Sequence, residues 1–549
     1  MTQQEKARWV VDAVKLNGIV DRTAEGPLKP EDIVVLRSLV ALAASLIEEL
    51  QKKVVSVRRL LRLIFGFKSE KTAAVLDAAP APAEEDGEGA APRGRDRNRT
   101  GPKPKVKGHG RNGAGAYTGA KRVSVPHPTM RHGDRCPDCA KGRIYLDARE
   151  HLFVHLEASA PVCATIYALE SLRCNFCGKA YTAEPPAEAG SEKYGPSVAA
   201  MIGLLKYGAG TPFNRVENLQ GAFGVPLPAS TQWDVVDSAT DVLAPVRDEL
   251  VRQAAQGEVV YNDDTTNKIL GLARGAATPD DLPDDPKGRT GTFTTAVMSE
   301  VDGRKIALFF TGPKHAGENL EDVLRQRAAE LGPPIQMSDA ATRNKPGTFE
   351  TLWANCLAHG RRKFVEIVED YPPECRFVLE TLRGVYRNDD LAREQKMSPQ
   401  ERLTFHQQES APLMTKLHEW CQRQLDDHLI EPNSRLGQAV RYLLNHWEKL
   451  TLFLRVAGAP LDNNLTERAL KKVILHRKNS MFYRSLRGAH VADVFMSLIH
   501  TAELARVQSY DYLLALLSHP REVASAPASW LPWNYKATIA AIAMPPPAG

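Results

Sequence analysis

The chain has 549 residues, a formal net charge of +5, and 43% hydrophobic and 25% charged residues. These proportions are ordinary for a globular protein, and the length suggests three or four domains of about 150 residues each. A run of 18 or more apolar residues does not occur, which excludes the class of proteins with transmembrane helices. The first residues lack the basic and apolar segments of a secretory signal, so we expect a cytoplasmic protein without a membrane partner.

The N-terminal third is predicted to hold a long helix followed by a linker. Residues 31–71 carry an apolar stripe at spacings of mostly three and four, which is typical of a coiled coil and favours self-association. A helix packed on its own domain is the alternative. Residues 75–125 are rich in Ala, Pro, Gly and charge, which predicts a disordered linker. Between Arg93 and Arg122 there are ten basic residues and one acid, a stripe that could bind DNA phosphates or simply be solvated.

Four cysteines form two CxxC pairs, Cys136/Cys139 and Cys174/Cys177, separated by 34 residues. Each pair can turn two thiolates toward one ion, so the spacing predicts a Zn²⁺ site in a zinc ribbon. The alternative is four free thiols. Cys163 lies in the intervening strand pattern, where we expect it to be packed.

The next segment is predicted to be helical. The helix NRVENLQGAFG ends at a glycine, and a second helix is expected to start near Ser230. This outline fits a DNA-binding helix-turn-helix as well as an ordinary corner of a helical bundle.

From residue 257 the pattern changes to strands. EVVYND, FTTAVMSEV and KIALFFTG read as strands, and Asp302-Gly303 predicts a hairpin between the last two. A helix through ENLEDVLRQRAAELG and a strand IQMSD follow, which predicts a mixed α/β sheet. Residues 376–456 read as an inserted helical bundle, after which the α/β pattern resumes at LDNNLTERALKKV.

Three acids stand at the ends of these elements. Asp263 ends the first strand, Asp339 ends the strand IQMSD, and Glu467 opens a helix. Carboxylates from separate elements suit Mg²⁺ or Mn²⁺, which prefer oxygen ligands. Each acid also has a structural alternative: a turn acid, a cap, or an ion pair with Lys471 one helical turn on.

The pair Asp263-Asp264 raises the question of which carboxylate acts. Side chains alternate along a strand, so the two aspartates face opposite sides of the sheet if the strand persists that far. Only one of them can then enter a given site directly.

Basic residues cluster at 361–363 and again in the residues that follow Glu467. Such clusters suit a polyanionic substrate, and a basic solvent-exposed face is the alternative. The candidate DNA-binding residues are Arg361, Arg362, Lys363, Arg468, Lys471, Lys472, Arg477 and Lys478.

The chain resembles bacterial transposases of the insertion-sequence-66 family. The resemblance rests on seven blocks in order: LLRLIFGFKSEK, the pair CPDC and CNFCG, YNDDTT, CLAHGRRKF, RLGQAVRYLLNHWEKL, DNNLTERALKKVILHRKNSMFYRSLRGA and WLPWNYK. It implies a ribonuclease-H-like catalytic domain with a DDE triad, in which Asp263, Asp339 and Glu467 are the catalytic magnesium ligands. The family usually has Glu where this chain has Asp264, Thr-Pro where it has Thr265-Thr266, and Arg-Pro where it has Lys471-Lys472.

The resemblance implies a DNA transposase that cleaves transposon ends and transfers strands into target DNA, acts as a homo-oligomer and uses accessory proteins. A catalytically decayed transposase that serves as a DNA-binding repressor is the alternative. The expected fold class is multidomain α+β. In chain order, we expect a helical, coiled-coil region (1–74), a basic linker (75–125), a zinc ribbon (126–188), a helical DNA-binding segment (189–256), a first catalytic part (257–375), a helical insertion (376–456), a second catalytic part (457–520) and a tail (521–549).

Overall fold

The protein is described from a computed structural model. The structure describes residue 72 and residues 128–139, 141–145, 159–173, 180–186, 192–272 and 291–543. The coiled coil expected over 31–71, the linker expected over 75–125, and Cys174 and Cys177 lie outside these residues. Among the described helices, none combines the length and the apolar character needed to cross a membrane.

The described residues belong to two compact units. The first contains chiefly Asp248–Ile474 and Arg484–Asp493, and the second contains Glu84–Arg247, Leu475–Tyr483 and Val494–Gly549. Three helices contribute residues to both units, namely α7 (Ala229–Ala254), α15 (Asn464–Ser480) and α16 (Leu486–Leu504).

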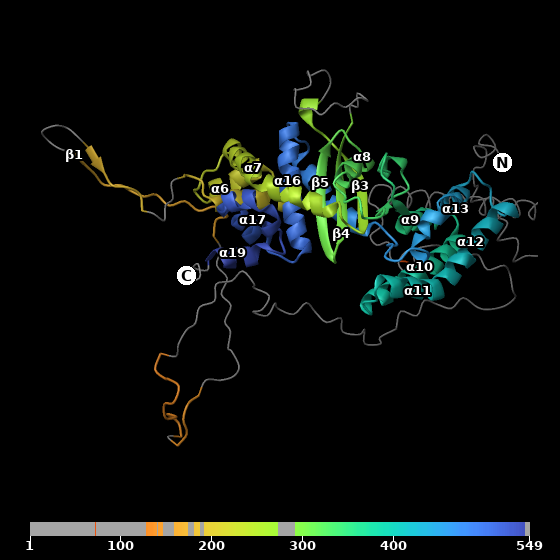
Figure 1. Cartoon of the computed structure of the whole chain (residues 1–549), viewed down its shortest axis with the longest axis horizontal. Coiled ribbons are helices and arrows are strands. Elements are labelled where there is room, and N and C mark those ends of the chain that lie inside the picture. Colours follow the sequence, from red (N-terminus) through yellow and green to blue (C-terminus); the bar gives the residue numbers. More distant parts are fainter. Residues whose placement is uncertain are drawn as a thin grey trace, which may run out of the picture. The chain divides into compact units, whose positions relative to one another are not determined.

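A five-stranded mixed sheet forms the centre of the first unit, as predicted (Figure 1). Its order is β5–β4–β3–β6–β7; β4 is antiparallel to β3 and β5, whereas β3, β6 and β7 are parallel. The central parallel strand, β6, is short and fully buried, which suits a sheet with both faces covered at this position. The strands are β3 (Val259–Asn267), β4 (Thr292–Val301), β5 (Arg304–Gly312), β6 (Ile335–Ser338) and β7 (Leu352–Asn355).

The hairpin between β4 and β5 has the expected turn. Asp302 and Gly303 have φ values of 49° and 73°, and aspartate and glycine tolerate this left-handed region better than other residues. β3, by contrast, is longer than its apolar run suggests. It pairs with β4 as far as Asn267, so Asp263 lies inside the strand rather than at its end. Polar residues extend the strand because β4 supplies backbone partners for them.

Helix α8 (Ala316–Leu324) contacts β3 and β4. It ends earlier than the sequence suggests. Arg327, which we expected inside the helix, instead donates hydrogen bonds to the carbonyl oxygens of Ala255, Gly257 and Gly332. The helix therefore ends at Leu324, because these tertiary hydrogen bonds outweigh the helix propensity of the residues that follow.

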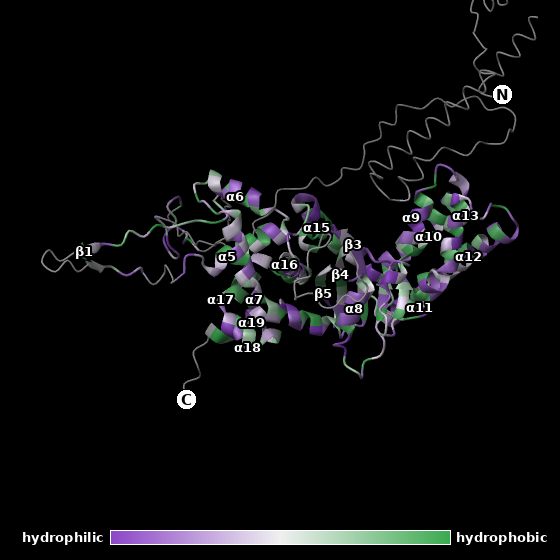
Figure 2. Cartoon of the chain, turned by 90° about the horizontal axis from the view of Figure 1, so that it is seen from above, coloured by the Kyte–Doolittle hydropathy of each residue, from purple (hydrophilic) through white to green (hydrophobic). Residues whose placement is uncertain are grey.

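The helical insertion is present and carries both apolar and polar faces (Figure 2). Inside it, Asp389 is buried and pairs with Arg393, Arg402 and His406. Because a buried charge needs partners, this cluster ties α10 to α11. The helices from β7 onward are α9 (Leu357–Val365), α10 (Pro372–Glu394), α11 (Pro399–Glu409), α12 (Ala411–Asp426), α13 (Arg435–Asn445) and α14 (Trp447–Leu450).

The second unit is mainly helical. Gly203 lies against Phe495, where an added Cβ would come within 2.3 Å of the aromatic ring, so this contact requires glycine. The two helices of the predicted helix-turn-helix are α6 and α7, and Glu217 accepts a hydrogen bond from the Ala229 amide between them. Elements contained in this unit are β1 (Ser171–Arg173), β2 (Ala180–Thr182), α5 (Pro196–Gly203), α6 (Phe213–Ala222), α17 (Ser509–Ser518), α18 (Pro520–Ser525) and α19 (Tyr535–Ala543).

The prediction that Cys163 is packed in a strand is wrong. Cys163 is exposed and precedes β1 without strand pairing. The alternating apolar pattern around it has no facing layer to bury it among the described residues.

Candidate active site

Two of the three predicted acids are positioned by neighbouring strands: Asp263 lies on β3, and Asp339 directly follows the last residue of β6. β3 and β6 are parallel, and Tyr261 is the register partner of Met337. Asp263 and Asp339 each follow two residues later, so this register places both carboxylates on the same face and at the same level of the sheet. The sheet thereby brings together acids that are far apart in the sequence.

The proximity of these carboxylates has an electrostatic consequence for Asp263. Burial, followed by the charges of Asp339, Asp264 and Glu467, raises the pKa of Asp263 to about 7, and a hydrogen bond from a backbone N–H partly opposes this rise. That N–H belongs to Asp264 and lies 2.8 Å from Asp263 Oδ1. Crowded carboxylates repel one another, so the site favours either a proton or a cation.

Glu467 lies in the first turn of α15, where the helix N-terminus favours negative charge. Its side chain is 20% exposed. His359 Nε2 lies 3.8 Å from Oε1, and an Arg362 guanidinium nitrogen lies 3.7 Å from Oε2. Oε1 is buried and has no hydrogen-bond partner among the described residues, which leaves one oxygen available to a ligand. The pairing with Lys471 that we considered from the sequence is therefore not the one observed.

Cys356, His359 and Glu467 also form a group whose potential metal-ligating atoms lie within 4.8 Å of one another. Burial raises the pKa of the Cys356 thiol to about 12, and its Sγ accepts a hydrogen bond from the Asn463 amide at 3.2 Å. Metals bind the thiolate form, so this thiol fits a structural role better than a metal-ligating one. The all-oxygen set of Asp263, Asp339 and Glu467 fits a hard divalent cation.

The carboxylate of Asp339 is held by the loop that follows it. Its Oδ1 accepts hydrogen bonds from the Asn344 side chain and from the Ala341 amide at 3.0 Å. The carbonyl oxygen of Asn344 in turn accepts hydrogen bonds from Asn262 at 2.8 Å and Gln336 at 2.7 Å, and all three side chains are buried. This network fixes the loop against β3 and β6, and so fixes the orientation of Asp339.

Asp264 points to the opposite face from Asp263, as strand alternation predicts. Its side chain is only 1% exposed and contacts His315 Nδ1 at 3.0 Å and the Ala316 amide at 3.3 Å, at the start of α8. The Arg343 guanidinium lies 3.4 Å from its other oxygen. The two adjacent aspartates therefore have different surroundings: Asp264 is compensated by two basic side chains, and Asp263 faces other acids.

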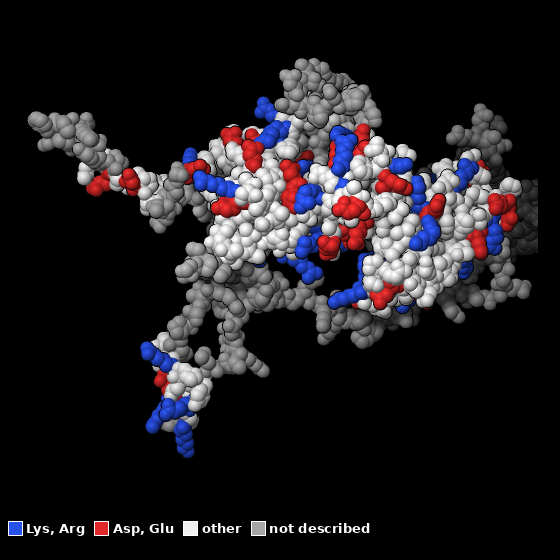
Figure 3. All heavy atoms as spheres, viewed as in Figure 1, with Lys and Arg blue, Asp and Glu red and all other residues white. Residues whose placement is uncertain are grey.

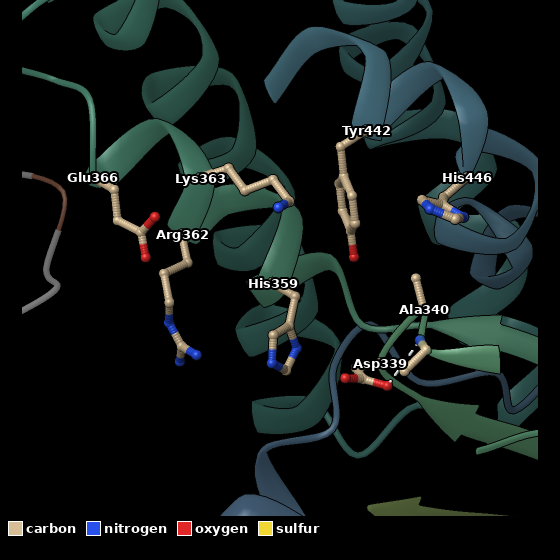
Figure 4. Close-up of a pocket in the computed structure, with 9 residues that line it drawn as sticks. Asp339, Ala340, His359, Arg362, Lys363, Glu366, Tyr442 and His446 are labelled. Atoms are coloured by element: carbon tan, nitrogen blue, oxygen red, sulfur yellow. Dashed lines mark hydrogen bonds between the residues drawn. The ribbon is translucent and has the colours of Figure 1, made fainter. Parts of the chain in front are cut away.

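A cavity of about 380 Å³ lies beside Asp339, between α9 and α13 (Figure 4). Burial, followed by the charge of Asp339, raises the pKa of Tyr442 to about 12, so its hydroxyl is protonated at neutral pH. Sequence reasoning missed Tyr442 and His446, because nothing in a helical pattern shows which turn of an inserted helix approaches a distant strand. The lining residues are Asp339, Ala340, Ala341, His359, Arg362, Lys363, Glu366, Tyr442 and His446.

The predicted basic residues are divided between the elements. Arg362 and Lys363 line the cavity. On α15, Arg468 and Lys471 are exposed on the same unit as the acids, whereas Arg477 and Lys478 belong to the second unit. On the face drawn in Figure 3, acidic and basic side chains are interspersed over the described elements.

His476, which directly precedes Arg477 and Lys478 in the sequence, is not cationic at neutral pH. It is buried, and burial followed by the charge of Lys206 lowers its pKa to about 3.

The first CxxC pair lies in a tight turn. The Cys136 amide donates a hydrogen bond to the Gly142 carbonyl at 2.9 Å. Hydrogen bonds from the Gly142 and Lys141 amides lower the pKa of Cys139. A lowered pKa favours the thiolate that zinc would bind. A four-cysteine site is not seen among the described residues, since the second pair lies outside them.

A family model described as "Transposase IS66 family" matches residues 192–491, which include all three acids. Three proteins of Sinorhizobium fredii are similar to the chain. "Uncharacterized protein y4hP" is 29% identical over 402 residues, covering 68% of each chain. "Uncharacterized protein y4jD" is 28% identical over 62% of this chain and 66% of its own length. "Uncharacterized protein y4qI" is 26% identical over 61% of this chain and 62% of its own length.

Proposed function

Because the chain belongs to the IS66 family of transposases, we propose that it cleaves DNA at the ends of a mobile element and joins the freed strands to target DNA. One observation carries this proposal: Asp263, Asp339 and Glu467 come from three separate elements, yet the charges of the other two raise the pKa of Asp263. Such a cluster of acids has no evident purpose in folding, because mutual repulsion disfavours it.

We further propose that the first unit is a ribonuclease-H-like catalytic domain with Asp263, Asp339 and Glu467 as its DDE triad. Support comes from the mixed sheet, in which an antiparallel hairpin is followed by α8 and two parallel strands. This order places Asp263 and Asp339 side by side at β3 and β6.

The oxygen ligands fit Mg²⁺ or Mn²⁺, with Asp263 and Asp339 holding the cations and Glu467 completing the site. When bound there, two such cations would activate the attacking oxygen and stabilise the leaving oxygen of a phosphodiester. In the first step, water attacks the phosphorus and the P–O3′ bond breaks, leaving a 3′-hydroxyl and a 5′-phosphate. In the second step, that 3′-hydroxyl attacks a target phosphodiester, forming a new P–O3′ bond while the P–O3′ bond of the target strand breaks and releases a target 3′-hydroxyl. The loop of Asn344 orients the carboxylate of Asp339 throughout.

Basic side chains are proposed to position the DNA. Arg362 and His359 lie beside the carboxylate of Glu467, while Lys363 and the exposed Arg468 and Lys471 are proposed to contact phosphates. Lys472, Arg477, Lys478 and Arg361 are proposed as further DNA contacts by position in the family blocks.

We also propose roles for the regions outside the catalytic domain, in binding the ends of the element and in joining subunits. Zn²⁺ at Cys136, Cys139, Cys174 and Cys177, together with the basic linker and the helix pair α6 and α7, would bind the ends of the element. The N-terminal helix would join subunits so that two ends can meet, with accessory proteins assisting.

Two other functions compete with this proposal. A catalytically decayed copy would bind the same ends as a repressor, and Asp264 in place of the usual Glu keeps this alternative open. A general nuclease would cleave without preference for ends.

End cleavage by the purified full chain tests the proposal. Labelled DNA carrying a terminal repeat should be nicked with Mg²⁺ and not with EDTA, and random duplex should compete poorly. Full activity in both Asp263→Ala and Glu467→Ala would sink the assignment. End binding without nicking would favour the repressor, and equal cleavage of random duplex would favour the nuclease.

A further inference from the structure

The helical insertion forms one wall of the cavity beside Asp339. Tyr442 and His446 come from the end of α13, and they face His359, Arg362 and Lys363 on α9 (Figure 4). Of the three proposed catalytic acids, only Asp339 lines this cavity. A group bound in the cavity therefore lies next to the reaction centre and not among all three carboxylates.

The lining chemistry suits an anion. Lys363 supplies an ammonium group, and the Tyr442 hydroxyl supplies a donor. Figure 4 shows that hydroxyl directed toward Asp339 and Ala340, with the Lys363 ammonium approaching from the α9 side. Glu366 and Asp339 are the acids of the lining. Of its basic side chains, Arg362 and His359 lie beside Glu467, whereas Lys363 lies over the Tyr442 ring and is the cation of the proposed site.

An aromatic base fits this cavity less well than a phosphate. Lys363 Nζ lies 4.5 Å from the centroid of the Tyr442 ring, so the ammonium already occupies one face of that ring. His446 packs against the same ring, with centroids 4.7 Å apart in an edge-on arrangement. Stacking a base on Tyr442 would displace one of these contacts, whereas a phosphate could accept hydrogen bonds from Lys363 and Tyr442 in their present positions.

We propose that this cavity binds the DNA phosphate adjacent to the scissile one, with Lys363 and Tyr442 as its hydrogen-bond donors. The insertion is then a substrate-positioning element, because α13 provides one of the two donors. This inference rests on the proposed function, in that it assumes that DNA is the substrate.

A chemical double-mutant cycle tests the inference by binding affinity, independently of cleavage. Terminal-repeat duplexes would each carry one uncharged methylphosphonate, placed in turn at the phosphates flanking the cleavage position. Affinity would be measured with Ca²⁺ for the wild-type chain, Lys363→Met and Tyr442→Phe. Arg441→Met is the matched control, since Arg441 is exposed on the same helix and does not line the cavity.

Lys363→Met should weaken binding about 10- to 100-fold, as expected for a hydrogen bond to a charged group. One methylphosphonate position should weaken wild-type binding by a similar factor and have little further effect on Lys363→Met. Lys363→Arg should restore part of the affinity, and Arg441→Met should respond to that position as the wild type does. Circular dichroism would verify that each variant is folded.

Additive losses at every methylphosphonate position would overturn the inference. A second result would also overturn it. If an abasic nucleotide abolished the effect of Lys363→Met on affinity and no methylphosphonate did, the cavity would hold a base and not a phosphate. Failure of the proposed function is a different outcome: the coupling would be seen in binding, but Mg²⁺ would give no cleavage.

Discussion

Replacing Asp263 with asparagine should stabilise the metal-free protein while it removes activity. The pKa of Asp263 is raised to about 7, whereas an aspartate in an unfolded chain has a pKa of about 3.9. The folded state therefore resists ionisation of this acid. Ionisation of Asp263 therefore lowers the free energy of unfolding as pH rises from about 4 to about 7. Above about pH 7 this effect is constant.

The pKa of Asp263 is about three units higher in the folded state than in the unfolded state. At pH 8, this difference lowers the free energy of unfolding by about 4 kcal/mol. Asparagine is a neutral analogue of the protonated acid, so Asp263→Asn should raise the free energy of unfolding by up to about 4 kcal/mol at pH 8 and by less than about 1 kcal/mol at pH 4. Exposed Asp426, replaced in the same way, should change stability by no more than about 0.5 kcal/mol.

Urea denaturation of the full chain in EDTA, at pH 8 and at pH 4, measures these differences. Added Mg²⁺ should stabilise the wild type at pH 8 more than the variant, because the cation relieves the same repulsion. A variant no more stable than the wild type at pH 8, or a gain of equal size at pH 4, would refute the reasoning.

Four further substitutions test other parts of the account. Asp264→Asn should lower the free energy of unfolding by about 1–3 kcal/mol, because it leaves His315 and Arg343 without their anionic partner. The variant should cleave more slowly but still cleave. A loss of cleavage activity equal to that of Asp263→Asn would contradict the placement of the two aspartates on opposite faces of the sheet. Glu467→Gln should abolish Mg²⁺-dependent cleavage while gel-shift affinity for the end is kept; lost affinity would point to a structural role. Burial raises the pKa of Asp389, but a hydrogen bond from His406 and the charges of Arg402 and Arg393 outweigh it and hold that pKa well below its usual range. Asp389→Asn should therefore lower the free energy of unfolding by about 3–5 kcal/mol, measured by urea denaturation at pH 7. This loss should shrink as pH falls below about 4, and a loss independent of pH would argue against the ion pairs. Cys139→Ser should reduce bound zinc, measured by atomic emission, from one ion per chain toward none; unchanged zinc content would exclude the four-cysteine site.

Local signals in the sequence predicted the hairpin and four of the five strands of the sheet, β3 to β6, but did not establish β7 as a strand. Asp302-Gly303 favours a tight turn through its local conformation, and the β-branched and aromatic residues of β4 favour a strand. Alternation along β3 correctly separated Asp263 from Asp264.

Features that depend on tertiary contacts could not be predicted. The end of α8 is set by Arg327 and carbonyl groups on other segments. The partners of Asp264 come from residues 51 and 79 positions away, and their pairing follows from the packing of α8 and not from any local pattern. The approach of Tyr442 to Asp339 likewise depends on how the insertion folds back.

Strand transfer of a pre-cleaved end tests the central claim most directly. Terminal DNA with a free 3′-hydroxyl would be incubated with the full chain, a target plasmid and Mg²⁺. We expect joined products from the wild type, and none from a 3′-deoxy end or from Glu467→Gln. Wild-type protein that binds the end but yields no joined product, or a Glu467→Gln variant that joins as well as the wild type, would contradict the account.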